Sequence, residues 1–303
     1  MTDIATERDM EAQSRVERGF ILVPVLWVLA LLAIVTAILT RTVTNDIKVS
    51  ANLLHRSEQE ELSDGVARLA IRYVLSNPVD ADHIGAFKLD GTPETCLVGE
   101  SIAAVSIAST AGQIGLNTAS AELLEKLFEG AGAADPKSLA AAVVDFRDAD
   151  DEALPGGAEA AEYAAAGREY EPKNGPFKIV DELDQVLGMT SEVFERVRPL
   201  VTTRSRLPSP DLAVASPALR ALSLANDLAN TSRVRNVQIR VSVHGLAASR
   251  TYTRETVILI EQRIQGGFAL KNWIRSDQHL PTTGGLDASQ LPSCITSLLA
   301  TNS

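Results

Sequence analysis

The sequence predicts an α+β protein: a long N-terminal helix leads into a sheet, and an all-helical domain is inserted between two parts of that sheet. Three observations support this class. Residues 20–39 form an uncharged, mostly apolar run, and an amphipathic helical pattern continues it to residue 76. β-branched residues alternate in two distant stretches, 100–109 and 237–243. Between these stretches, residues 117–203 are rich in alanine and in helix-capping signals.

Composition narrows the functional classes. The chain has 303 residues and a formal net charge of -11, which disfavours a general binder of nucleic-acid phosphates. Its 4 histidines are scattered, so no imidazole cluster suggests zinc. The 2 cysteines, Cys96 and Cys294, are too few for a disulfide framework, and either a bridge or a free pair is compatible with the sequence.

The apolar run is long enough to cross a hydrocarbon core as a helix. It exceeds the roughly 7 to 15 apolar residues of a secretory signal and ends in Ile-Leu-Thr-Arg, a poor cleavage site. An ordinary single-pass anchor is the simplest interpretation of the run alone. The amphipathic half that follows is expected to pack on a domain and to end at Asn77-Pro78.

Beyond this helix, residues 79–116 are expected to form short strands and turns. Four helices are then expected in the segments TASAELLEKLF, PKSLAAAVVDFRD, VDELDQVLG and TSEVFERVRPLV. Strand character returns at 237–243, and residues 256–260 are expected to pair back across a turn near 245–249. Residues 204–232 would lead back to the sheet through one helix, and the turn-rich tail 280–303 is expected to be loosely ordered.

An acidic block within the helical part is the segment whose residue types best suit a binding or catalytic site. It holds the carboxylates Asp145, Asp148, Asp150, Asp151, Glu152, Glu159 and Glu162 around a Pro-Gly-Gly turn. Carboxylates so close together repel one another unless they are solvated, protonated or bridged by a cation, and a loop of oxygens suits calcium. A solvated acidic loop is the alternative, and the spacing does not match an EF-hand. A glycosidase carboxylate pair is disfavoured because aromatic residues are only 4% of the chain.

Two other stretches, IGLNTAS at 114–120 and NGPFKIVDELDQVLGM at 174–189, resemble pieces of the helix-hairpin-helix modules of DNA-uptake receptors. A membrane-anchored DNA-uptake receptor is therefore the alternative function. Residues 117–200 carry 18 acidic and 8 basic side chains, however, so phosphate binding at this surface is disfavoured. A phosphate-binding loop is missing from the sequence, and no catalysis is expected.

The junction Arg18-Gly19-Phe20 resembles the leader of type IV prepilins. In that family a prepilin peptidase cuts after the glycine and methylates the new N-terminal phenylalanine, so the resemblance implies cleavage between Gly19 and Phe20. Most members carry a glutamate as fifth mature residue, which pairs with the N-terminus of a neighbouring subunit during filament assembly. Here that position is Pro24, and a subunit without this pairing role can dispense with a carboxylate that is costly in lipid.

Together with the leader, four motifs resemble the type II secretion system protein K family, a family of minor pseudopilins. These motifs are LNTAS at 116–120, DFRDAD at 145–150, PGGAE at 155–159 and KNGPF at 173–177. The resemblance implies a pilin-like domain with an inserted helical domain that binds calcium. Asp148, Asp150 and Glu159 are then the first ligand candidates, followed by Asp151, Glu152 and Glu162, while Asp145 is expected to cap or brace the loop.

The resemblance also implies a place in the cell and a set of partners. It places the chain in the bacterial inner membrane as a single-pass protein, with its C-terminal domain in the periplasm. The implied partners are the prepilin peptidase and the minor pseudopilins GspI, GspJ and GspH, and no nucleic acid is expected. The expected function is non-enzymatic: the subunit would cap or nucleate the tip of the pseudopilus that serves protein export.

The expected domain boundaries follow from these patterns. They are a leader at 1–19, a transmembrane and spine helix at 20–76, pilin-like parts at 77–116 and 204–279, an inserted helical domain at 117–203, and a tail at 280–303.

Overall fold

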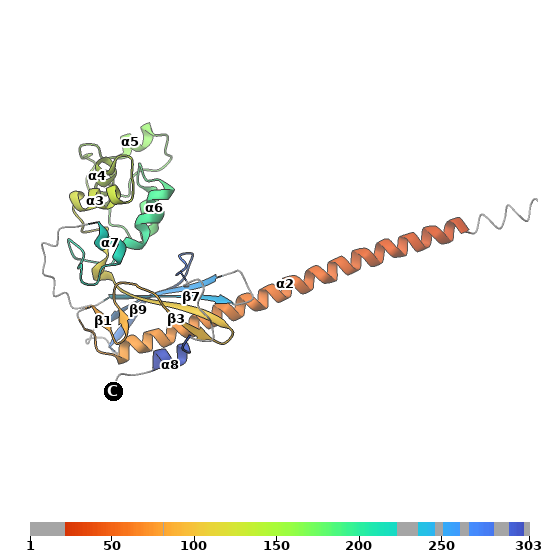
Figure 1. The fold of residues 1–303 in the computed structure, drawn as a ribbon. Coiled ribbons are helices and arrows are strands. Elements are labelled where there is room, and N and C mark those ends of the chain that lie inside the picture. Colours follow the sequence, from red (N-terminus) through yellow and green to blue (C-terminus); the bar gives the residue numbers. More distant parts are fainter. Residues whose placement is uncertain are drawn as a thin grey trace, which may run out of the picture. The chain divides into compact units, whose positions relative to one another are not determined.

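The computed structural model describes residues 22–80, 82–222, 236–245, 251–260, 267–281 and 291–299. The chain divides into two compact units, Met1–Glu58 and Gln59–Ser303. The predicted α+β class with a long N-terminal helix is confirmed (Figure 1). The same helix, α2 (Leu22–Ser76), supplies most of the first unit and the first residues of the second.

Helix α2 is a single helix of 55 residues. Its segment Val23–Arg41 has a mean hydropathy of 2.6, and none of that segment is buried by the rest of the protein, as expected for a helix that faces lipid. Pro24 lies in the first described turn of α2, and proline is tolerated near a helix start, where the first backbone N–H groups lack intrahelical acceptors. The predicted start at Phe20 lies outside the described residues. The predicted end is confirmed: Asn77 caps the helix by donating from Nδ2 to the Tyr73 carbonyl oxygen at 2.9 Å.

The C-terminal part of α2 packs against the sheet. Its buried side chains recur three or four positions apart, at Val66, Ala70, Tyr73 and Val74. Opposite charges fix the register of the helix on the sheet, because the guanidinium of Arg254 donates to Asp64 and also to Glu60, the latter at 3.2 Å. Arg254 is buried, so breaking this contact would cost more free energy than breaking a surface ion pair.

The main sheet is antiparallel and has the strand order β3-β4-β7-β8-β9. Its strands are β3 (Glu94–Val98), β4 (Ser101–Ser109), β7 (Asn236–Gly245), β8 (Thr251–Ile260) and β9 (Phe268–Ser276). Strands β4 and β7 are neighbours, with Ser109 paired to Val237, although more than a hundred residues separate them along the chain. The helical region is thus inserted between two adjacent strands of one sheet, as the sequence predicts. A short hairpin, β1 (His83–Ile84) and β2 (Phe87–Lys88), precedes β3.

The two faces of the sheet differ. Val237, Ile239, Val241 and Val243 of β7 are fully buried in one core together with α2, as their strict alternation predicts. The alternate side chains Gln238 and Arg240 belong to the other face. Figure 1 shows the helices of the inserted region on that second side, and the end of α2 with α8 (Cys294–Leu299) on the first.

The helical region has a core of its own, built around Phe128, Phe146, Tyr163 and Leu183. Its entry and exit segments pair in parallel as β5 (Ile114–Gly115) and β6 (Val201–Thr202). Between them lie α3 (Ala121–Gly130), α4 (Pro136–Arg147), α5 (Ala160–Ala165), η2 (Val180–Gln185), α6 (Ser191–Val197) and η3 (Arg198–Leu200). The short helices η1 (Thr110–Gly112) and α7 (Pro217–Ala221) flank the region.

Side-chain caps explain where these helices begin. Ser120, Asp135 and Thr190 each accept a hydrogen bond from a backbone N–H in the first turn of α3, α4 and α6. The predicted helix in VDELDQVLG is present, as the 3-10 helix η2. The 6 residues of this tighter helix bury Leu183.

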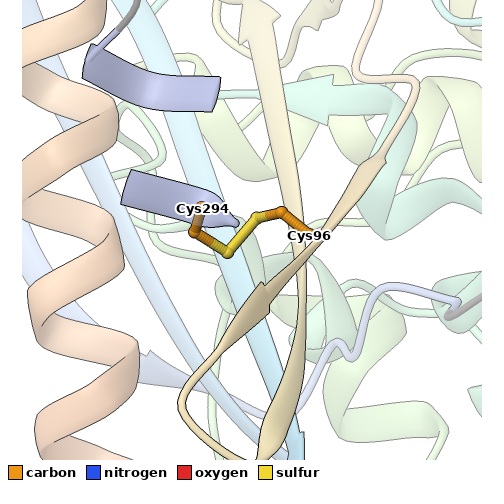
Figure 2. Close-up of a disulfide and its surroundings, with 2 residues drawn as sticks. All are labelled: Cys96 and Cys294. Atoms are coloured by element: carbon orange, nitrogen blue, oxygen red, sulfur yellow. A yellow bond between two sulfur atoms is a disulfide. The ribbon is translucent and has the colours of Figure 1, made fainter. Parts of the chain in front are cut away.

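The C-terminal segment differs most from the expectation. Strand β9 was not predicted, and residues 291–299 are not loosely ordered: they include helix α8 (Cys294–Leu299), with Cys294 and Leu298 buried in the sheet core. Cys294 forms a disulfide with Cys96 of β3, with their Cα atoms 4.9 Å apart (Figure 2). The question that the sequence left open is therefore settled in favour of a bridge. Apolar contacts and this covalent bond hold the segment against β3.

Candidate metal centre

The acidic loop starts at a fixed point, the C-terminal end of α4. The last residue of that helix, Arg147, donates from its guanidinium to the carbonyl oxygens of Leu116 and Ala119. These contacts tie the end of α4 to the segment just before α3. The carboxylates that follow Arg147 therefore leave the helix from a defined position.

Asp145 holds the acidic loop in place through hydrogen bonds to its backbone. It is fully buried, and its carboxylate accepts hydrogen bonds from the backbone N–H of Leu154 at 3.2 Å and of Ala158 at 2.7 Å. Burial raises the pKa of Asp145, against the opposing effect of these two hydrogen bonds. A Cβ at Gly157 would collide with this carboxylate, so the second glycine of the Pro-Gly-Gly turn is required. Asp145 thus braces the loop, as the sequence predicts.

The brace brings together three carboxylates. One oxygen each of Asp148, Asp150 and Glu159 lies within 4.8 Å of the other two. Glu159 is 4% exposed, and both of its carboxylate oxygens are buried without a hydrogen-bond partner among the described residues. The same holds for Oδ1 of Asp148. Buried oxygens without donors are rare in folded proteins, and here three of them lie on two of the three clustered residues, Asp148 and Glu159.

The other three predicted ligands lie differently. Asp151 accepts a hydrogen bond from Nδ2 of Asn174 at 2.7 Å, and Glu162 accepts one from the backbone N–H of Glu159 at 2.9 Å as part of the cap of α5. Glu152 is exposed. None of the three belongs to the group of converging oxygens found among the described residues.

Sequence reasoning missed Asn174. Its Nδ2 donates to the Asp150 carbonyl oxygen at 3.2 Å as well as to Asp151, and its Oδ1 is a further buried oxygen without a partner among the described residues. Its φ of 47° is in the left-handed region, which asparagine tolerates better than most residues. The signal was present in the sequence, since an Asn-Gly pair favours a turn and an amide oxygen suits a hard cation.

The raised pKa values in this group of carboxylates indicate that it lacks a nearby positive charge. Burial, and with it the nearby charges of Asp145, Asp148, Asp151 and Asp150, raises the pKa of Glu159 to about 7. Burial and neighbouring carboxylates also raise the pKa of Asp148. Protons and cations therefore compete for these oxygens as the pH falls through the pKa of Glu159. The donor set contains only oxygen, the chemistry preferred by calcium, so the residues present fit this ion.

The predicted cleavage and assembly residues lie at the other end of the chain. Gly19 and Phe20 are outside the described residues, and their role stays a prediction. Pro24 is described, and the first turn of α2 contains no acidic residue.

This fold defines a class of protein. A long apolar helix continues into the core of an antiparallel sheet, and a helical region with a carboxylate cluster interrupts that sheet. A solved chain from "The Crystal Structure of the GspK-GspI-GspJ complex from enterotoxigenic Escherichia coli Type 2 Secretion System" has the same fold: the TM-score is 0.51 at 15% identity, over 76% of this chain and 99% of that chain.

The segment that carries the site is similar to a known protein family. Residues 103–206, which include β4 and the helical region through β6, match the family model "Type II secretion system (T2SS), protein K". No curated protein matches the sequence. Over these residues the chain is similar to the protein K family of type II secretion, and over most of its length it shares the fold of the solved chain.

Proposed function

We propose that this subunit occupies the tip of the type II secretion pseudopilus and starts or caps its assembly, without catalysing a reaction. The observation that carries the proposal is Pro24. A subunit that docks below another needs a carboxylate near its N-terminus to pair with its neighbour, and the first turn of α2 has none. The first subunit of a filament has no subunit above it, so it needs no such carboxylate.

The location follows from the apolar helix and the disulfide. Val23–Arg41 is the one candidate membrane span among the described residues, and we propose that it lies in the inner membrane before assembly. The bridge between Cys96 and Cys294 supports a periplasmic C-terminal domain, because disulfides persist in the bacterial periplasm and are rare in the cytosol. The prepilin peptidase would cut after Gly19 and methylate Phe20.

The partners are proposed from the structural likeness and from the family resemblance. The matched chain belongs to a complex of GspK, GspI and GspJ. We infer that this chain forms a tip complex with the corresponding pseudopilins GspI and GspJ, and that GspH joins it, as the resemblance implies.

Calcium is proposed for the helical region, where its role would be to hold the loop. Asp148, Asp150 and Glu159 would supply carboxylate oxygens, and the unpaired Oδ1 of Asn174 would add a neutral ligand. The cation would offset the repulsion that raises the pKa of Glu159. Its contribution is to stabilise the folded region.

The tip position is tested by giving the subunit the missing carboxylate. We expect Pro24→Glu to place this protein along the whole pseudopilus, while the unmodified protein stays at one end. Immunogold labelling of assembled filaments measures the distribution, and secretion of an exported enzyme reports function. Pro24→Ala is the matched control, because it removes the proline without adding charge. Finding the unmodified subunit all along the filament would overturn the proposal.

The alternative of a DNA-uptake receptor has less support. Residues 117–200, which contain the expected hairpins, carry 18 acidic against 8 basic side chains, and the family model that matches them is one of secretion. Tight, salt-sensitive binding of duplex DNA by the full chain would revive this alternative.

A further inference from the structure

A cleft of about 320 Å³ lies between the helical region and the face of the sheet opposite α2. One wall comes from residues 178–181 and 201–204, and the other from side chains of β7, β8 and β9. Its volume falls at the lower end of the range of ligand pockets, roughly 300 to 1,000 Å³. The cleft is separate from the acidic loop, because none of the carboxylates of that loop lines it.

Positive charge predominates in this cleft, although the chain as a whole has a net charge of -11. Five cationic and three anionic side chains line it. The three anions are already paired with two of the cations. Glu255 pairs with Arg240 at 3.0 Å. Asp181 and Asp277 both pair with Arg198, at 3.1 and 3.0 Å.

The remaining cations, Lys178, Arg204 and Arg275, have no ion-pair partner in the part of the chain that the structure describes. The guanidinium of Arg275 lies over the Tyr252 ring, 4.7 Å from its centroid, a contact that orients the group without neutralising it. Three unpaired cations around one cleft favour an occupant with several negative charges.

Two apolar side chains complete the cleft. Ile179 on one wall is 57% exposed, and Ile274 on the other is 47% exposed. A bare inorganic anion would leave both uncovered. An occupant with carboxylates and a branched aliphatic group would pair with the cations and remove this apolar surface from water.

We propose that this cationic cleft, defined by Lys178, Ile179, Arg204, Ile274 and Arg275, binds an acidic peptide segment of a partner protein, one aliphatic side chain of which covers the isoleucines. A nucleic acid fits less well, because its phosphates would extend beyond the cleft over residues 117–200, which carry 18 acidic and 8 basic side chains, whereas a short acidic peptide can stay within the cleft. The inference depends on neither Pro24 nor a bound cation, so it can fail or succeed independently of the proposed tip position.

The test uses the full chain in detergent and fluorescein-labelled acetyl-EEIEE-amide as the probe. We expect the peptide to bind, acetyl-EESEE-amide to bind more weakly, and acetyl-KKIKK-amide not to bind, as measured by fluorescence anisotropy. Binding should weaken as NaCl is raised, because the cations line a cleft open to solvent. The double variant Lys178→Glu with Arg204→Glu should weaken binding at least about tenfold, as expected when two attractive charges become repulsive.

Arg206→Glu is the control: it reverses one charge, where the double variant reverses two, at an exposed position outside the cleft, and binding should stay within about twofold. Equal binding of EEIEE by the control and by a double variant with an unchanged melting temperature would overturn the proposal, as would no binding by the unmodified chain. If the double variant does not fold, a peptide with benzophenone in place of isoleucine can be cross-linked to the unmodified chain. Cross-links at residues 178–179, 204 or 274–275 would support the proposal, and cross-links confined to other residues would overturn it.

Discussion

The sheet region and the helical region differ in how far their buried polar side chains are hydrogen-bonded. In the sheet region, buried Ser242 and Thr253 share a hydrogen bond at 2.7 Å, and buried Arg254 has two carboxylate partners. Within the described part of that region, one buried side-chain oxygen, Oε1 of Gln59, lacks a partner. In the helical region, four such oxygens occur, on Asp148, Glu159 and Asn174, and all belong to or contact one loop.

This difference indicates how each region reaches its stable state. The sheet region satisfies its polar groups within the chain and closes its end covalently through Cys96 and Cys294. The helical region folds around a group of carboxylates that lacks a positive charge. A buried anion without a partner costs free energy, so this region should depend on an ion, whereas the sheet should depend on the disulfide.

The largest expected effect concerns the bridge. Cys96 and Cys294 are 198 residues apart along the chain, and closing so long a loop stabilises the folded state by about 5 kcal/mol in the chain-entropy model. Replacing both cysteines with serine should lower the unfolding midpoint of the sheet region. Trp273 fluorescence in a Trp27→Phe background measures it, since these are the two tryptophans of the chain. An unchanged unfolding midpoint would contradict the proposed stabilisation by the disulfide. The response of the helical region to calcium serves as the internal control.

Calcium should have the next largest effect, and only on the helical region. At a concentration one hundred times the Kd, calcium stabilises the folded state by about 2.7 kcal/mol, so amide exchange in residues 148–162 should slow strongly relative to chelator. Glu159→Gln should abolish this response, yet stabilise the calcium-free protein, because it removes the carboxylate whose pKa is raised to about 7.

Glu171→Gln is the control for this experiment, because it removes a carboxylate at an exposed position of the same region. It should leave the calcium response unchanged. Identical amide exchange in calcium and in chelator would refute the metal proposal. The helical region would then not depend on an ion, contrary to what the comparison with the sheet region suggests.

The smallest expected effect concerns Asn174. Asn174→Gly removes the neutral oxygen but keeps a residue that tolerates the φ of 47°. Calcium affinity should fall by about fivefold, near 1 kcal/mol, in an isothermal titration. Asn174→Asp, which keeps an oxygen at that position, should bind at least as tightly as Asn174→Gly. An affinity unchanged by Asn174→Gly would remove this residue from the set of ligands.

Much of the fold could be predicted because its signals are local. Ser120, Asp135 and Thr190 are capping residues at the predicted helix starts, and the alternation in β7 marks a strand with one buried face. The 3-10 geometry of η2 and the packing of α8 could not be predicted. Both depend on what the segment contacts, and a turn-rich tail contains no local signal for the β3 edge that it covers.

The candidate site was predictable in part. The family resemblance ranked Asp148, Asp150 and Glu159 first, and these three are the residues whose oxygens converge. Spacing alone could not have separated them from Asp151, Glu152 and Glu162, because the turn at Gly156 and Gly157 decides which carboxylates face inward. Asn174 comes from a separate segment: its Asn-Gly pair indicates a turn, but nothing in a single sequence places that turn beside the carboxylates.

By itself, the sequence determined the features that depend on neighbours along the chain: the apolar span, the junction at Gly19-Phe20, Pro24, the helix caps and the concentration of carboxylates. Only the tertiary structure decided the features that depend on distance in space. These are the bond between Cys96 and Cys294, the orphaned oxygens that converge with Glu159, and the three unpaired cations of the cleft. The reason is physical: composition sets the charge and apolar content of a segment, whereas pairing and burial are set by segments that only the fold brings together.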